Sequence, residues 1–187
     1  MLREPLETGQ ITISRAARQA DFPAQFQLIA AMNPCPQGYN CDGKDLCLCT
    51  PEQQQKYRSK ISAPLLDRID IHIEVPQVPR QVLQQQNTSE GSDAIRQRVL
   101  SAYKTQMNRH GKINAELTNK ELEQSCHLNT AEQQLIDKAM EKLRLSARAY
   151  HRILKLARTI ADLDTKNEIN TQHLSEAISY RSLDRLQ

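Results

Sequence analysis

The chain has no tryptophan, only 4% aromatic residues and five glycines in 187 residues. Such a shortage of large aromatic side chains argues against a β-sandwich or barrel, whereas the many alanine, leucine and glutamine residues favour helices. Every apolar run is shorter than the roughly 20 residues that a membrane helix needs, and no pattern of a secretory signal is visible in the sequence. We therefore expect a cytoplasmic, mainly α-helical protein with no membrane partner.

A phosphate-binding loop is also missing. The Gly-x4-Gly-Lys-Ser/Thr signature is absent, because the two Gly-Lys pairs are followed by aspartate at 45 and isoleucine at 113. This chain alone therefore lacks the main cradle that nucleotide-binding proteins use for phosphates.

Residues 1–79 read as a partial α/β unit. Residues 26–32 are nearly all apolar, as in a strand buried on both faces, and isoleucine and valine alternate with polar residues over 69–75. The expected elements are a helix end over 2–8 stopped by Gly9, a hairpin over 11–22, a strand over 26–32, helices over 50–59 and 62–67, and a strand over 69–75.

Residues 92–187 read as an all-helical domain, separated from the first by a glutamine-rich linker over 80–91. Capping patterns place the helix starts. The expected N-caps are Thr50 in the first part, and Ser92, Thr118 with Glu121, Thr130 with Gln133, Ser146, and Asn170 or Thr171 in the second.

Two polar residues stand at junctions between elements. Asn33 follows the expected strand and precedes Pro34, where a neutral amide can orient a water near a phosphate, although a turn asparagine is the simpler interpretation. Arg68 stands between a helix and a strand. It can be an arginine finger that stabilises phosphoryl-transfer charge, or it can form a structural ion pair with Asp67 or Asp70.

Basic residues recur along one face of the helix that begins near Ser146, namely at 144, 148, 152 and 155. A basic stripe is usually a solvated face, but Glu141 is its only acidic neighbour in sequence, so pairing within the helix cannot neutralise it. An anionic partner for Arg148 and its neighbours is one interpretation.

Four of the five cysteines crowd into residues 35–49, at Cys35, Cys41, Cys47 and Cys49. Thiolates bind zinc tetrahedrally, and a loop with so few apolar residues has little else to hold it. The spacings are unlike the usual Cys-x2-Cys knuckles, so reduced thiols or a redox disulfide remain alternatives. Cys126, far from the others, is expected to face the core.

The net positive charge of the chain is small and lies in its second half. The net charge is +3, and basic and acidic residues balance over 1–80, so the excess lies in 81–187. Arg15 and Arg18 nevertheless stand near the tip of the expected hairpin, where they can contact a polyanion such as DNA or simply discourage aggregation at a solvated edge.

Taken in order, these segments resemble the ComM/YifB family, the magnesium-chelatase-like branch of the AAA+ ATPases, over essentially the entire chain. The matching runs are residues 2–7 (LREPLE), 11–15 (ITISR), 30–36 (AAMNPCP), 49–51 (CTP), 65–70 (LLDRID) and 148–158 (RAYHRILKLAR).

The resemblance implies the C-terminal half of an AAA+ core followed by a helical lid, from a protein that binds ATP with Mg²⁺ and assembles as a ring, expected to be a hexamer. Asn33 matches the sensor-1 position, Arg68 the arginine finger acting across subunits, and Arg148 the sensor-2 arginine of the lid. Residues 11–22 match the hairpin before sensor 1, which faces the central pore in related motors. DNA branch migration in natural transformation is the implied activity.

The chain departs from the family at two places. Walker A and Walker B would precede Met1, so this chain alone is not expected to hydrolyse ATP, and many relatives read Cys-Pro-Cys-Gly where this chain has Gln37. Two alternatives stay open: a magnesium-chelatase-type motor subunit that remodels a protein partner, and a non-catalytic, zinc-containing interaction module.

Overall fold

A computed structural model describes residues 2–15, 18–38, 47–76, 78 and 90–181 of the chain. The chain forms two compact units: an N-terminal unit of residues 1–69 and 74–78, and a C-terminal unit of residues 70–73 and 79–187. The described part is mainly helical, as expected, with one two-stranded sheet. Among the described helices, none combines the length and the apolar character needed to cross a bilayer.

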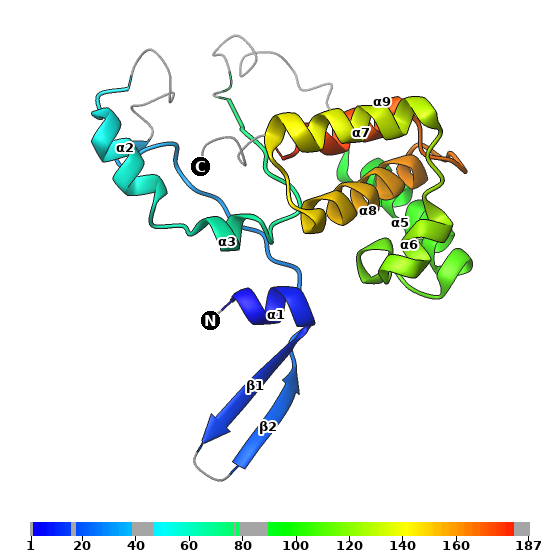
Figure 1. The fold of residues 1–187 in the computed structure, drawn as a ribbon, viewed down its shortest axis with the longest axis horizontal. Helices are drawn as coiled ribbons and strands as arrows, with labels where there is room; N and C mark the ends of the chain where they lie inside the picture. Colours follow the sequence, from blue (N-terminus) through cyan, green and yellow to red (C-terminus); the bar gives the residue numbers. More distant parts are fainter. Residues whose placement is uncertain (1, 16–17, 39–46, 77, 79–89, 182–187) are drawn as a thin grey trace. The chain divides into compact units, whose positions relative to one another are not determined.

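The N-terminal unit begins with helix α1 (Arg3–Thr8) and a hairpin (Figure 1). Gly9 ends the helix with φ of 67°, a left-handed conformation that glycine adopts without steric cost, as predicted. Strands β1 (Gln10–Arg15) and β2 (Arg18–Pro23) pair antiparallel, with Arg15 opposite Arg18 at the turn end. The hairpin prediction is confirmed.

Two short helices complete the regular structure of this unit, α2 (Pro51–Arg58) and α3 (Ala63–Leu66), both where the sequence predicts them. The hydroxyl of Thr50 accepts from the N–H of Gln53, and the Gln53 side chain accepts from the N–H of Thr50. This reciprocal capping satisfies two backbone groups that the first turn would otherwise leave without partners.

The strands predicted over 26–32 and 69–75 are wrong, because neither segment is a strand in the structure. Their apolar side chains are largely in solvent: Ile29 is 84% exposed and Val75 82%. A strand gains its stability from hydrogen bonds and side-chain contacts with a neighbouring strand. Within the described residues, the only strand pair is that of the hairpin, so these apolar runs have no sheet to join.

The C-terminal unit is a helical bundle in which α8 packs against α5, α6 and α9, and α7 packs against α9 (Figure 1). Its apolar core, which includes the predicted core residue Cys126, comes mainly from one stripe of each helix. The elements are α5 (Ser92–His110), the 3₁₀ turn η2 (Asn114–Glu116), α6 (Asn119–Ser125), α7 (Thr130–Leu143), α8 (Ala147–Leu163) and α9 (Thr171–Ser179).

Three predicted caps of this bundle are confirmed. Thr118 and Glu121 form a reciprocal capping box at α6, and the hydroxyl of Ser146 accepts from the N–H of Ala149 at α8. Asn170 caps α9, where its own N–H is accepted by Nδ1 of His173. These starts follow from contacts within one helical turn, which the sequence contains in full.

Two other caps differ from the prediction. Asn129, one residue before the predicted Thr130, caps α7, and Glu132 takes the reciprocal position expected of Gln133. An asparagine caps at least as well as a threonine, and Glu132 is a good capping-box partner for it, so the helix begins after Asn129 and not after Thr130. Ser92 begins α5 but does not cap it: the N-cap is Gly91, with no side-chain hydrogen bond.

A buried polar cluster ties the bundle together. Asp162 of α8 forms ion pairs with Arg158, one turn earlier, and with Arg109 of α5. Its carboxylate also accepts from Nδ2 of Asn114 at 2.9 Å. The Arg158 guanidinium in turn donates to the carbonyls of Lys166 and Asn167, at 2.6 and 2.7 Å. One buried carboxylate thus joins α5, η2, α8 and the α8–α9 loop.

At the surface of the same unit, Glu121 is expected to make stability depend on acid pH. Hydrogen bonds from Lys112, and then from Thr118, lower the pKa of Glu121 from its usual 4.5 to about 2. The contribution of this carboxylate to stability is therefore complete above pH 4.5 and is lost as the pH falls toward 2. We expect that the free energy of unfolding of Glu121→Gln, measured by urea denaturation, decreases less than that of the wild type as the pH falls over this range. Glu123→Gln, on the same helix, should show the same dependence on pH as the wild type.

Candidate functional site

Asn33 lies in the N-terminal unit, exposed, and beside the turn formed by residues 35–38. A Cβ placed on Gly38 would come 3.0 Å from Nδ2 of Asn33, so the asparagine amide lies against this glycine. Gly38 has φ of 64°, and its N–H donates to the carbonyl of Cys35 at 3.1 Å. The structure thus places Asn33, the residue that matches the sensor-1 position, next to the turn that carries Cys35, and not at the end of a strand.

Arg68 follows α3 and lies in the same unit. Its Nη2 bonds to the carboxylate of Glu7, near the end of α1, and its Nη1 donates to the carbonyl of Pro64 at 2.6 Å. The Arg68 side chain is only 14% exposed. Arg68 therefore has a carboxylate partner, as the structural ion-pair interpretation expects. The partner is Glu7, which lies far from Arg68 in the sequence, and not Asp67 or Asp70.

Arg148 lies in the C-terminal unit, in the first turn of α8. Its side chain is exposed, while the next residue, Ala149, is buried in the bundle. The helix that carries Arg148 is held by its opposite face, so the guanidinium projects from a rigid element.

The rest of the basic face of α8 is partly engaged within its own unit. Arg152 pairs with Asp70, whose segment belongs to the C-terminal unit, and His72 in that segment donates its N–H to the carbonyl of Tyr180 at 2.9 Å. Lys155 donates to the carbonyl of Ala115 at 2.9 Å, and burial, together with Arg152, lowers its pKa. The acidic partner that the sequence near α8 does not provide comes from residue 70.

Of the two hairpin arginines, Arg18 is exposed at the start of β2, and all of β2 is exposed. Arg15 ends β1 opposite it. The backbone therefore brings the two positions together at the tip, as the predicted contact with a polyanion requires.

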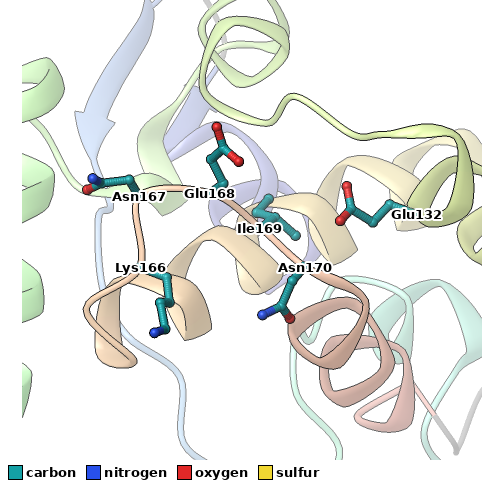
Figure 2. Close-up of a pocket in the computed structure, with 6 residues that line it drawn as sticks. All are labelled: Glu132, Lys166, Asn167, Glu168, Ile169 and Asn170. Atoms are coloured by element: carbon teal, nitrogen blue, oxygen red, sulfur yellow. The ribbon is translucent and has the colours of Figure 1, made fainter.

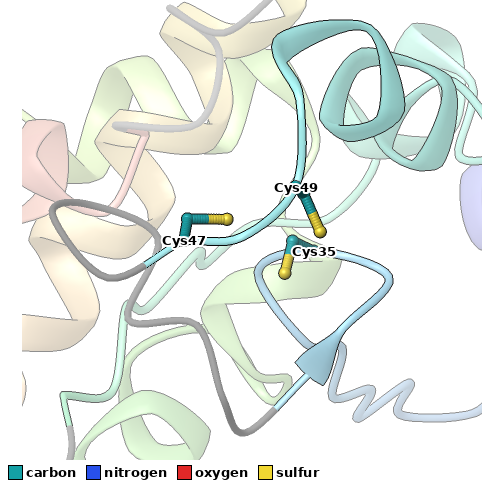
Figure 3. Close-up of side chains that lie close together, drawn as sticks. All are labelled: Cys35, Cys47 and Cys49. Atoms are coloured by element: carbon teal, nitrogen blue, oxygen red, sulfur yellow. The ribbon is translucent and has the colours of Figure 1, made fainter.

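Three of the four predicted metal ligands converge in the N-terminal unit (Figure 3). The sulfur atoms of Cys35, Cys47 and Cys49 all lie within 4.8 Å of one another. Cys35 and Cys49 are 1% and 7% exposed. Cys41 lies outside the described residues and stays a prediction.

Hydrogen-bond donors surround these sulfurs. Nε2 of Gln54 lies 3.3 Å from Sγ of Cys47 and donates to it, and the backbone N–H of Gln37 donates to Cys49. Burial, with the neighbouring Cys35 and Cys47 thiols, nevertheless raises the pKa of Cys49, and the Gln37 donor opposes this rise. A cation among the sulfurs would reverse the balance, because thiolates rather than thiols bind metals.

A hollow of about 480 Å³ in the described surface contains none of the predicted site residues (Figure 2). It lies along the α8–α9 loop of the C-terminal unit and is open and mixed in charge. Its lining residues are Glu132, Lys166, Asn167, Glu168, Ile169 and Asn170. Glu132 and Asn170 serve the caps of α7 and α9, so this hollow carries no functional assignment.

Family comparisons cover both parts of the chain. Residues 1–83 match the family model described as magnesium chelatase, subunit ChlI, and residues 89–181 match that of its C-terminal region. The chain is 48% identical over 186 residues to competence protein ComM of Haemophilus influenzae. It is 44% identical over 186 residues to protein YifB of Escherichia coli, and 32% identical over 184 residues to an uncharacterised protein of Mycobacterium tuberculosis.

These alignments take in 96–99% of the chain but only 36% of each relative. The two family models match consecutive parts of the chain in order, and the identities extend over both. On these grounds the chain belongs to the magnesium-chelatase-like family that includes the ComM and YifB proteins.

Proposed function

We propose that this chain is part of an AAA+ ATPase motor that assembles as a ring, expected to be a hexamer, and couples ATP hydrolysis to DNA remodelling. The observation that carries the proposal is the family match of both parts of the chain, N-terminal and C-terminal, in one continuous sequence. The exposed position of Arg148 in the first turn of helix α8 supports it, since a lid arginine contacts the nucleotide from the surface of the lid.

In this proposal, three side chains act on the nucleotide. Arg68 of one protomer and Arg148 of the lid offset the charge that develops on the γ-phosphate, because guanidinium groups remain charged and bind phosphate oxygens in a bidentate manner. Asn33 orients the attacking water. Mg²⁺ enters with ATP and is held by residues outside this chain.

The DNA part of the proposal rests on the hairpin and on one relative. Arg18 is exposed at the hairpin tip, where a basic group can contact phosphates, and the Haemophilus influenzae relative is named a competence protein. Branch migration during natural transformation would use such a motor.

A second candidate is a magnesium-chelatase-type subunit that remodels a protein, which the description of both matching family models favours. The two candidates share the ATPase chemistry and differ only in what the ring acts on.

The test is ATP hydrolysis by the intact protein that contains this chain, with and without branched DNA. We expect DNA to stimulate turnover and Arg18→Ala to reduce that stimulation, while Lys138→Ala, at an exposed position on α7, leaves it unchanged. Stimulation by a protein partner and not by DNA would replace the DNA proposal with the chelatase-type one. Wild-type turnover in both Arg68→Ala and Arg148→Ala would instead indicate that this chain takes no part in ATP hydrolysis and serves as a non-catalytic, zinc-containing interaction module.

A further inference from the structure

We propose that Cys35, Cys47 and Cys49 bind a structural zinc ion that joins the turn over 35–38 to the residues directly before α2. The three sulfurs already converge in the structure, although twelve to fourteen residues separate the first from the others. Soft thiolate ligands favour zinc over magnesium or calcium, and a structural zinc ion is bound tetrahedrally, so the three sulfurs supply three of its four ligands.

Burial is the first argument. Among the described residues of the N-terminal unit, the only buried positions are Pro5, Cys35, Gly38 and Cys49. Large apolar side chains of the same unit, such as Phe26 and Leu48, are in solvent. The thiols are therefore the centre of their own small cluster, to which no other apolar residue of the described chain contributes. So small a cluster supplies little hydrophobic stabilisation, and small loops of this kind usually depend on a metal or a disulfide.

The local backbone is the second argument. The turn over 35–38 needs the left-handed φ of Gly38, and the N–H of Gly38 donates to the carbonyl of Cys35 at 3.1 Å, which fixes the backbone of one ligand. On the other side, Cys49 directly precedes Thr50, the N-cap of α2, whose positive end stabilises a nearby anion. The N-terminal end of α2 therefore favours a metal-bound thiolate at Cys49.

Charge around the cluster is the third argument. A shallow hollow of about 230 Å³ beside Cys49 is lined by Lys56 and Lys60, and none of the described residues that line it is acidic. Three thiolates and one zinc ion carry a net charge of −1, which these ammonium groups offset. The amide of Gln54, which donates to Cys47 and to the carbonyl of Cys49, is placed as an outer partner that orients two ligands.

The test is the metal content of the full chain, purified with a thiol reductant and measured by plasma mass spectrometry. We expect about one zinc ion per wild-type chain. In Cys35→Ser and Cys49→Ser, the zinc content per chain should fall by about tenfold or more. The matched control is Cys126→Ser: Cys126 is equally buried but lies in the helical bundle, so its loss should leave zinc unchanged.

Cobalt provides a second measurement that does not depend on how the variants fold. Wild-type chain reconstituted with Co²⁺ should show the intense thiolate-to-metal charge-transfer absorption and the visible bands of a tetrahedral site. Absence of these bands, a disulfide among the three cysteines in reduced preparations, or iron with acid-labile sulfide would overturn the zinc assignment. None of these readings depends on ATP hydrolysis, so the outcome is independent of the proposed motor function.

Discussion

Replacing Arg68 by alanine in the intact protein is expected to lower ATP turnover by about a thousandfold, the effect typical of a lost arginine finger. Arg68→Lys should be nearly as inactive, because an ammonium group cannot reproduce the planar fork of a guanidinium on two phosphate oxygens. The measurement is steady-state phosphate release at saturating ATP.

The ion pair between Arg68 and Glu7 makes a matched control possible. If the arginine serves only to join α1 to the segment after α3, Glu7→Gln should reduce turnover as much as Arg68→Ala does. If the arginine acts on phosphate, Glu7→Gln frees the guanidinium and turnover stays near wild type. The Arg68 and Glu7 side chains are 14% and 34% exposed, so a phosphate that replaces the Glu7 carboxylate must supply an equivalent charge-assisted hydrogen bond.

Mixing two inactive variants tests whether Arg68 acts across the subunit boundary. In a ring formed from Arg68→Ala and Asn33→Ala protomers, some interfaces combine an intact Asn33 from one protomer with an intact Arg68 from its neighbour. Turnover should therefore reappear on mixing. If mixing restores no activity although mixed rings form, Arg68 does not act in trans and its proposed role is wrong.

The second large effect is expected at Asp162, in the polar cluster of the C-terminal unit. Asp162→Asn keeps the shape of the side chain but leaves Arg158, which is 1% exposed, and Arg109 without their shared counter-charge. Breaking a buried ion pair by removing one partner costs about 3–5 kcal/mol, because the remaining charge stays away from water. We expect a loss of this size in the free energy of unfolding, measured by urea denaturation with helical circular dichroism.

Glu168→Gln is the matched control, since Glu168 is an exposed carboxylate on the loop that follows α8. Its change should stay within about 0.5 kcal/mol of wild type. A similarly small change in Asp162→Asn would show that water or a backbone shift compensates the two guanidinium groups, and that the cluster does not hold the bundle together.

Local signals predicted the helical part of this protein well. Thr50, Thr118 and Ser146 cap helices where the sequence places them, and α8 begins directly after the predicted Ser146. Each cap depends on a hydrogen bond to a residue two or three positions away. The error at α7 is of the same kind, because Asn129 and Thr130 are neighbouring candidates and only their relative fit decides between them.

The candidate site was predictable in its residues but not in their partners. The crowding of cysteines over 35–49 indicated a cluster, and three of the four thiols do converge. Nothing near Arg68 in sequence pointed to Glu7, and nothing near Arg152 pointed to Asp70, because both contacts join residues more than fifty positions apart. The buried cluster around Asp162 gave no signal beyond an ordinary Arg-x3-Asp spacing on α8.

The amino-acid sequence alone thus predicted the helix positions, the hairpin, the cysteine cluster and the family relationship, because each depends on neighbours in sequence or on recognisable runs. Which charges are neutralised, and whether an apolar run becomes a strand, was decided only by the folded chain. An ion pair or a β-ladder needs a second segment at a particular distance, and that segment can stand anywhere in the sequence. Residues 26–32 and 69–75 have the composition of strands and, within the described chain, no neighbour to pair with.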